Sequence, residues 1–146
     1  LGRGGKNVRI RPGASRRVHT LSLRDALASH GPRDVLVWLA LARGRRTVSR
    51  NLVLLARPKH IDLPEPGITT QVKPRKNGNF RVTLRAKKPA LWSWLAFADL
   101  DAHVSDNFFH LQPGKPVTVE VVPDRALTVN RFRSALSVHS LRDTYA

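Results

Sequence analysis

Apolar and polar residues alternate with a period of two in several short segments of the chain, and no long helical stripe interrupts them. In the segment 80–86, FRVTLRA, every second residue is apolar, and the segment 117–121, VTVEV, repeats the pattern. Alternation of this kind places one face of a β-strand towards a core and the other towards water. Both segments are therefore predicted to be half-buried strands.

Three further segments are predicted to be strands. Residues 131–141, RFRSALSVHSL, carry apolar side chains at positions of one parity. These side chains are Phe132, Leu136 and Val138. Residues 35–42, VLVWLALA, and 91–98, LWSWLAFA, are apolar at both parities, which is typical of strands covered on both faces. We expect the last two in the middle of a sandwich or beneath a neighbouring domain.

Turn signals separate the strands at intervals typical of an antiparallel architecture. They are Pro12-Gly13, Gly31-Pro32, Asn77-Gly78 and the segment 112–115, QPGK. Asn-Gly favours a tight hairpin because both residues tolerate positive φ, and Pro-Gly suits the middle of a type II turn. Short strands and turns spaced at about 8 to 12 residues predict an all-β fold, an antiparallel β-sandwich.

One short helix is predicted beside this all-β pattern. Leu23 and Leu27 share a helical face, and Ser22 precedes them as a candidate N-cap residue. We expect one or two helical turns there.

Proline residues mark a boundary between two units. Pro58, Pro64 and Pro66 interrupt the pattern between residues 55 and 67. Proline removes a backbone donor and restricts the residue before it, so this stretch is predicted to be an extended connector. Residues 1–56, with about four strands, are predicted to form an incomplete or minimal sandwich. Residues 57–146 hold enough strands for an immunoglobulin-like β-sandwich.

The chain is strongly basic, with a formal net charge of +16, and the excess is uneven. Residues 1–60 carry 14 Lys or Arg against two acids, whereas residues 61–146 carry 12 against eight. A basic first part raises the hypothesis of a polyanion-binding domain. Its candidate arginines are Arg16, Arg17, Arg43, Arg45, Arg46 and Arg50. In FRVTLRA the basic residues alternate with apolar ones, which is typical of a solvated strand face, so nucleic acid is the less favoured partner.

The composition offers little for a cofactor or a membrane. There is no cysteine, and the six histidines show no H-x-x-x-H spacing, so we predict no metal and no cofactor. No apolar run approaches the roughly 20 residues of a membrane-spanning helix, so no membrane partner is expected. The chain opens without methionine or a signal-peptide pattern, and we expect it to be a piece of a longer protein. Its location, cytoplasmic or exported, stays open.

The triplet Ser105-Asp106-Asn107 spells S-D-N, which serves in the active sites of β-lactamases. The partner motifs S-x-x-K and K-T-G occur nowhere in the chain, and neither does the G-x-S-x-G elbow of serine hydrolases. Retaining glycosidases use two carboxylates. The only glutamates are Glu65, in the connector, and Glu120, on the outward face of a predicted strand. We therefore predict no catalytic residue in this chain.

The three tryptophans lie in apolar segments. Trp38, Trp92 and Trp94 are predicted to pack in a core or against a neighbouring domain, as strand tryptophans do in sandwiches. Trp92 and Trp94 share a parity and should point to one face. Both remain candidates for stacking on a sugar, which keeps a carbohydrate-binding module as an alternative.

The segment 104–121, VSDNFFHLQPGKPVTVEV, resembles the F-S-D-N-F-F-x-L-x-P-G-E signature of the C-terminal immunoglobulin-like domain of β-mannosidases in glycoside hydrolase family 2. The matching positions are Ser105, Asp106, Asn107, Phe108, Phe109, Leu111, Pro113 and Gly114, whereas Val104 and Lys115 depart from the signature. Upstream, RPKHIDLPEPGITTQV is similar to the connector that enters this domain, and LSVHSLRDTYA is similar to its closing strand and tail. The resemblance covers about residues 57–141 and is weaker before them.

The resemblance implies that residues 1–56 are the latter part of a preceding β-sandwich domain and that residues 57–146 are the C-terminal one. The chain would be a non-catalytic accessory and structural module of a multidomain exo-glycosidase. That parent would remove β-D-mannose from non-reducing ends with retention, using two glutamates on a (β/α)8 barrel that no residue here matches. Its partners would be the parent's other domains and, for the parent only, a β-mannoside.

The signature also predicts a local structure. The side chains of Asp106 and Asn107 are expected to bond nearby backbone N–H groups in an Asx-type turn. Phe108 and Phe109 should point to opposite sides of an extended segment. Pro113-Gly114 is expected to reverse the chain so that VTVEV returns across the sheet.

Overall fold

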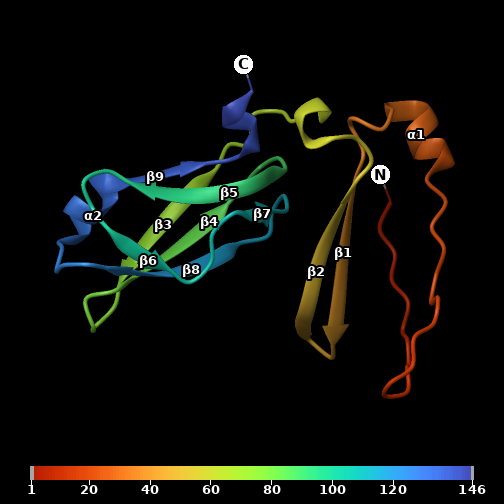
Figure 1. Cartoon of the computed structure of the whole chain (residues 1–146), viewed down its shortest axis with the longest axis horizontal. Coiled ribbons are helices and arrows are strands. Elements are labelled where there is room, and N and C mark those ends of the chain that lie inside the picture. The colour runs from red at the N-terminus through yellow and green to blue at the C-terminus, as the bar shows by residue number, and fades with distance from the viewer. Residues whose placement is uncertain (1, 146) are drawn as a thin grey trace. The chain divides into compact units, whose positions relative to one another are not determined.

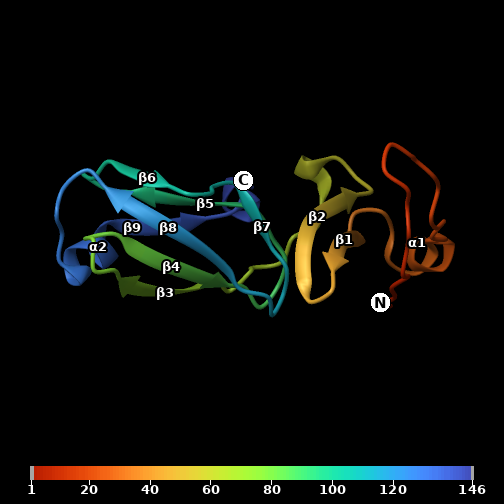
Figure 2. The same cartoon turned by 90° about the horizontal axis from the view of Figure 1, so that it is seen from below.

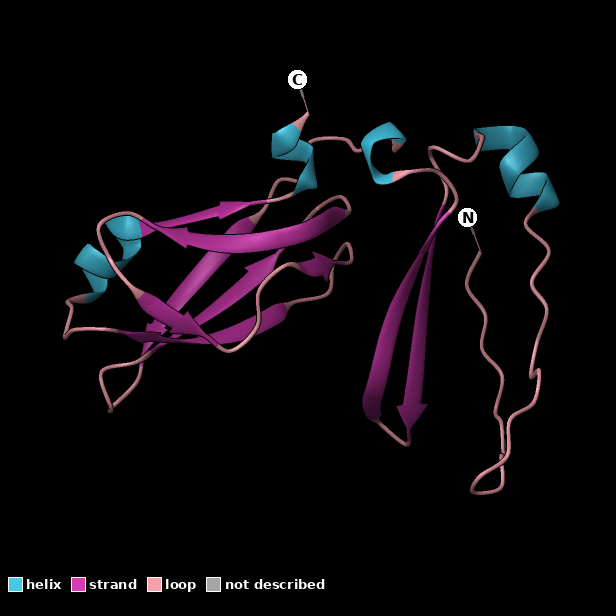
Figure 3. Cartoon of the chain, in the orientation of Figure 1, coloured by secondary structure: helices cyan, strands magenta, loops and turns pink. Residues whose placement is uncertain are grey.

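A computed structural model gives the structure of the chain and describes residues 2–145. Strands make up most of its regular structure, and the helices are short (Figure 3). The chain divides into two compact units, Leu1–Ile61 and Asp62–Ala146, whereas the sequence placed the boundary at residues 56 and 57. Among the described residues, no helix has the length and apolar composition needed to cross a membrane.

The first unit is built around one antiparallel hairpin. Strand β1 (Leu36–Arg43) pairs with β2 (Arg46–Leu54), and helix α1 (Arg24–His30) precedes them. A short 3-10 helix, η1 (Pro58–His60), ends the unit inside the predicted extended connector. The sequence predicts about four strands here, but residues 2–61 contain only these two. The Gly- and Arg-rich segment before α1 is loop (Figure 3).

The predicted helix of the first unit is confirmed, but its predicted cap is wrong. Leu23 occupies the N-cap position and makes no side-chain capping bond, so Ser22 lies one residue too early to cap. The helix ends at Gly31, whose N–H donates to the carbonyl oxygen of Leu27 at 2.9 Å. Gly31 has a φ of 74°, a conformation that glycine adopts without steric cost.

The second unit is a sandwich of two antiparallel sheets (Figure 1). One sheet has the strand order β3-β4-β8-β6, and the other has the order β7-β5-β9. The strands are β3 (Thr69–Pro74), β4 (Phe80–Arg85), β5 (Ala90–Phe97), β6 (Ala102–Val104), β7 (Phe109–Leu111), β8 (Val117–Pro123) and β9 (Leu136–His139). This confirms the predicted all-β, immunoglobulin-like antiparallel sandwich.

The core of the sandwich follows the period-two pattern. In β4, Val82 and Leu84 are fully buried, and Val82 lies opposite the buried Val119 of β8. Phe80 opposes Val121 in the same register, so one face of each strand supplies the core. Each fully buried apolar side chain of this size stabilises the fold by roughly 1.5–3 kcal/mol.

The end of the chain departs from the prediction of one strand over 131–141. Helix α2 (Val129–Ala135) comes first and β9 begins only at Leu136; α2 lies at one end of the sandwich in both views (Figures 1 and 2). Thr128 caps the helix, because its hydroxyl accepts the N–H of Arg131 at 3.2 Å. The helix buries Phe132, whose ring stacks on that of Phe80 at 4.0 Å. A spacing of four residues between Phe132 and Leu136 fits a helix as well as a strand.

Two of the predicted turns lie in the second unit. Asn77-Gly78 lies in the hairpin between β3 and β4, which pair along their whole length. At the second, the N–H of Lys115 donates to the carbonyl oxygen of Gln112 at 3.0 Å, and Gly114 has a φ of 74°. Strands β7 and β8 belong to different sheets, so this turn carries the chain from one layer to the other and does not return it across the same sheet.

Candidate functional site

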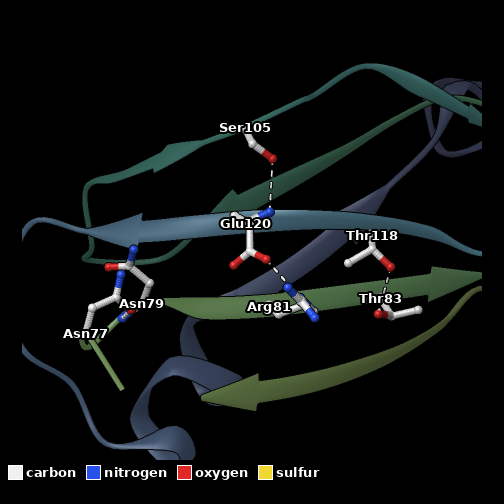
Figure 4. Close-up of polar contacts among 7 residues, drawn as sticks. All are labelled: Asn77, Asn79, Arg81, Thr83, Ser105, Thr118 and Glu120. Atoms are coloured by element: carbon white, nitrogen blue, oxygen red, sulfur yellow. Dashed lines mark hydrogen bonds and ion pairs between the residues drawn. The ribbon is translucent and has the colours of Figure 1, made fainter. Parts of the chain in front are cut away.

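The residues of the SDNFF signature occupy the loop between β6 and β7 and the start of β7. Ser105 holds the beginning of this loop on β8 with two hydrogen bonds. Its hydroxyl accepts the N–H of Glu120 at 2.9 Å, and its own N–H donates to the carbonyl oxygen of Glu120 at 2.9 Å (Figure 4). The serine hydroxyl is therefore used as a backbone partner, which gives it a structural role.

The outer face of the four-stranded sheet is polar. The guanidinium of Arg81 donates to the carboxylate of Glu120 at 2.8 Å, and the hydroxyls of Thr83 and Thr118 lie 3.0 Å apart (Figure 4). Arg81 and Glu120 are each 41% exposed. An exposed ion pair of this kind contributes about 0.2–1 kcal/mol, so Glu120 sits in an ordinary cross-strand contact.

Asn107 bridges the loop to the central strand of the other sheet. Its side-chain carbonyl oxygen accepts the N–H of Leu95 at 2.9 Å, and its amide nitrogen donates to the carbonyl oxygen of Leu95 at 3.3 Å. Leu95 is 4% exposed, so both backbone groups need a partner. Strand β7 begins only at Phe109, and the amide of Asn107 takes the place that another strand residue would hold.

The predicted Asx-type turn is not formed by Asp106 or by Asn107. Asp106 is exposed, and within residues 2–145 its carboxylate makes no hydrogen bond. Asn107 bonds a residue twelve positions earlier on β5 instead of closing a local Asx turn. Phe108, the next residue, has a φ of 59°, which turns the chain so that the Asn107 amide can face β5.

The two phenylalanines of the signature point to opposite sides, as predicted. Phe109 packs against the core between the sheets. Phe108 lies outside, where it is 61% exposed and its ring stacks on that of Trp94 at 5.8 Å. A left-handed conformation at a bulky residue costs about 1–3 kcal/mol, so the surrounding contacts hold Phe108 in place.

Trp92, one of the two candidates for sugar stacking, lies in a β-bulge of β5. Between the pairs Ala90↔Leu111 and Ser93↔Phe109, β5 has one residue more than β7. Trp92 adopts a φ of 44° there, and its N–H donates to the Nδ1 atom of His110 at 3.1 Å.

His110 must be neutral at Nδ1 to accept this hydrogen bond. Burial lowers the pKa of His110 below its ordinary value of 6.5, which favours the neutral ring. The ring of Trp92 meets that of His110 edge to face, with centroids 5.0 Å apart. Side chains of His110 and Asn107 thus complete the seam between β5 and β7 on either side of the Ser93↔Phe109 pair.

The outer face of the three-stranded sheet carries an aromatic strip. We define the strip as Trp92, Trp94, Phe108, His110, Ser137 and His139. The ring of Trp94 stacks with that of Phe108 and with that of His139, whose centroid lies 5.2 Å away. Because β7 and β9 flank β5, these two rings lie on opposite sides of Trp94 and cover both of its faces. Trp92 and Trp94 share one outward face, as their parity predicts, but neither belongs to the core between the sheets.

The remaining candidates belong to other segments of the chain. Trp38 is half-buried on β1 of the first unit. The arginines of the polyanion hypothesis are all exposed in the first unit, three of them around the β1–β2 turn. Glu65 is exposed in the connector. Within the described residues, no group of three or more His, Cys, Asp or Glu side chains could hold a metal ion.

The sequence analysis did not predict a role for His110. Its ring accepts a hydrogen bond from the backbone N–H of Trp92, and no sequence motif indicates this. The signature residues do not bring acids or bases together. They attach the β6–β7 loop to both sheets. Ser105 bonds β8, Asn107 bonds β5, and Phe109 enters the core. The arrangement is that of a structural clamp with an aromatic outer face.

Comparison with known proteins places both units. Residues 63–144 match the family model of the Ig-fold domain of mannosidases, and residues 1–60 match that of the mannosidase Ig/CBM-like domain. The crystal structure of a β-D-mannosidase from Dictyoglomus thermophilum is similar to the chain, with a TM-score of 0.62 and 19% identity. The match covers 72% of this chain and 13% of that one, so the chain spans a small part of the length of this structural neighbour. No curated protein matches the chain in sequence.

Proposed function

The chain belongs to the family of mannosidase Ig-fold domains, and from that premise we propose that it is a non-catalytic accessory and structural module of a β-mannosidase-like glycoside hydrolase. The observation that supports this most is the use made of the signature residues. Ser105, Asn107 and Phe109 are committed to holding a loop and two sheets together. None of them is left to act on a substrate.

The positions of the acids support the same proposal. A retaining glycosidase needs two carboxylates about 5–5.5 Å apart. Glu120 forms an ion pair with Arg81 on an exposed strand face, and Glu65 is exposed in the proline-rich connector before β3. Neither has the enclosed, polarised surroundings in which a carboxyl acts as a general acid. The chemistry would therefore belong to other domains of the parent.

The proposal extends to the parent protein. We place it in glycoside hydrolase family 2, with release of terminal non-reducing β-D-mannose and retention of configuration. Residues 1–56 would be the latter part of the preceding β-sandwich domain, and residues 57–146 the C-terminal domain. The hairpin of the first unit fits an incomplete sandwich, because a lone two-stranded hairpin is marginally stable in water.

The experiment is a hydrolysis assay on 4-nitrophenyl β-D-mannoside with two samples. One is the 146-residue chain, and the other is the full-length protein that contains it. We expect release of 4-nitrophenol only by the full-length protein. Hydrolysis by the isolated chain would overturn the non-catalytic role, and hydrolysis by neither sample would overturn the mannosidase assignment.

A further inference from the structure

The two outer faces of the second unit differ sharply in chemistry. The outer face of the four-stranded sheet carries the ion pair of Arg81 with Glu120 and the threonine pair of Thr83 with Thr118. The aromatic strip on the other sheet contains no Lys, Arg, Asp or Glu, although a quarter of the residues in the chain are charged. An exposed aromatic ring on a face without charged side chains is a candidate binding surface.

Backbone strain is concentrated in the same strip. Among the described residues, the non-glycine residues with positive φ are Trp92, Asp99 and Phe108. Two of these three belong to the strip, and both are bulky aromatics, for which this conformation costs about 1–3 kcal/mol. Strain of this kind persists where the surrounding structure imposes it, and it is enriched at sites that hold a ligand. The surrounding structure therefore holds the backbone of Trp92 and Phe108 in these conformations.

The accessible ring face in the strip is that of Phe108. Phe108 and His139 cover the two faces of Trp94, so the tryptophan presents its edge. Phe108 is the end of this stack, and it is 61% exposed. Its ring therefore offers a face to a ligand, and Trp94 supports it from behind. This changes the candidate residue for sugar stacking from the tryptophans to Phe108.

Polar groups lie beside the stack. The hydroxyl of Ser137 and the Nε2 atom of His139 lie 3.2 Å apart on the exposed side of β9. The ring of His110 is kept neutral by burial and by the N–H of Trp92. A ligand with hydroxyl groups and an apolar face matches this combination of aromatic rings and hydrogen-bonding side chains.

From these observations we propose that the aromatic strip binds a β-linked mannoside, with the pyranose ring stacked on Phe108. This rests on the proposed function, which supplies the sugar class. A β-D-mannopyranoside carries the axial hydrogens of C1, C3 and C5 on one face, and its axial 2-hydroxyl points to the other face. The hydrogen-bearing face is apolar and its polarised C–H groups are attracted to the negative face of an aromatic ring. In an α-mannoside the axial glycosidic oxygen occupies that face and prevents close stacking.

The test is a titration of the 146-residue chain with methyl β-D-mannopyranoside, followed by NMR at the indole N–H signals of Trp92 and Trp94. We expect saturable shifts with a dissociation constant in the millimolar range, which about 50 mM sugar would saturate. Methyl α-D-mannopyranoside, the matched ligand control, should bind at least about tenfold more weakly. Equal shifts with both anomers, or none with the β-anomer, would overturn the proposal.

Variants separate the strip from the rest of the surface. Phe108→Asn removes the ring, and asparagine tolerates positive φ, so the fold should persist. This variant should raise the dissociation constant at least about tenfold. Val122→Asn is the matched control, because it removes a 41% exposed apolar side chain from β8 and should leave binding unchanged. Unchanged binding in Phe108→Asn would overturn the proposal.

Sedimentation of the same samples distinguishes the competing use of the strip. If the strip is an interface between copies, the chain self-associates, Phe108→Asn makes it monomeric, and the sugar has no effect. That result would also overturn the proposal. None of these outcomes alters the hydrolysis test of the full-length protein, so sugar binding can fail while the accessory role stands.

Discussion

Asn107→Ala is expected to destabilise the second unit strongly. The substitution removes the hydrogen bonds at 2.9 and 3.3 Å to the backbone of Leu95. Each such bond contributes about 0.5–1.5 kcal/mol net, and leaving a buried backbone group unpaired costs about 1–3 kcal/mol. Leu95 lies on the central strand of its sheet and is 4% exposed, so water replaces the amide poorly. The expected loss in the free energy of unfolding is about 2–4 kcal/mol.

The assay is urea unfolding followed by tryptophan fluorescence, together with hydrogen exchange at the amide of Leu95. A unit of this size loses about 4–8 °C of melting temperature per kcal/mol, so in thermal unfolding the variant should melt about 8–30 °C lower. The Leu95 amide should lose most of its protection, because its acceptor is gone.

Asp106→Ala is the matched control, one residue earlier in the same loop. Its side chain is exposed, and we expect a change within about 0.5 kcal/mol. Asn107→Asp keeps the acceptor for the Leu95 N–H but sets an anionic oxygen beside the Leu95 carbonyl, so it should also destabilise. The reasoning is refuted if Asp106→Ala costs as much as Asn107→Ala, or if Leu95 stays protected in Asn107→Ala.

Three further changes test other parts of the second unit. Phe132→Ala empties the space beside Phe80 and should cost about 3–5 kcal/mol in urea unfolding; a loss under about 1 kcal/mol would contradict the stacked core. Because the pKa of His110 is lowered in the folded state, its contribution to stability is present above pH 6.5 and is lost as the pH falls from 6.5 towards the folded-state pKa. His110→Asn, which keeps an acceptor, should flatten the stability profile in that window, and an unchanged slope would count against the neutral ring. Single and double alanine variants of Arg81 and Glu120 should give a coupling energy of about 0.2–1 kcal/mol, and a value above about 2 kcal/mol would show that the pair is more than a surface contact.

Most of the correct fold prediction came from the alternation of apolar and polar residues in the strands. FRVTLRA and VTVEV became β4 and β8, with the apolar parity buried, because a half-buried strand repeats every two residues. The Asn77-Gly78 turn and the apolar segment of β5 were also placed correctly. The segment 131–141 was misread because Phe132 and Leu136 suit either period. Thr128, an N-cap residue just before them, was the signal for the helix.

The side-chain bonds of the loop could not be predicted from the sequence. The S-D-N triplet indicates a turn, and a local Asx turn is the default interpretation of Asp or Asn there. The partner of Asn107 lies on β5, and only the pairing of β5 with β7 and the left-handed residue Phe108 bring it within reach. The sequence does not indicate the bulge at Trp92 either, because the residue that usually adopts a positive φ is glycine.

The central claim is that this chain is a structural module of a mannosidase and carries none of its chemistry. Its most direct test is the hydrolysis of four aryl glycosides, the β-mannoside, α-mannoside, β-glucoside and β-galactoside, by the full-length protein and by the 146-residue chain. The account predicts that the full-length protein hydrolyses the β-mannoside with the highest kcat/KM and that the chain alone hydrolyses none of the four. Hydrolysis of any of the four by the chain alone, or no hydrolysis of the β-mannoside by the full-length protein, would contradict the account.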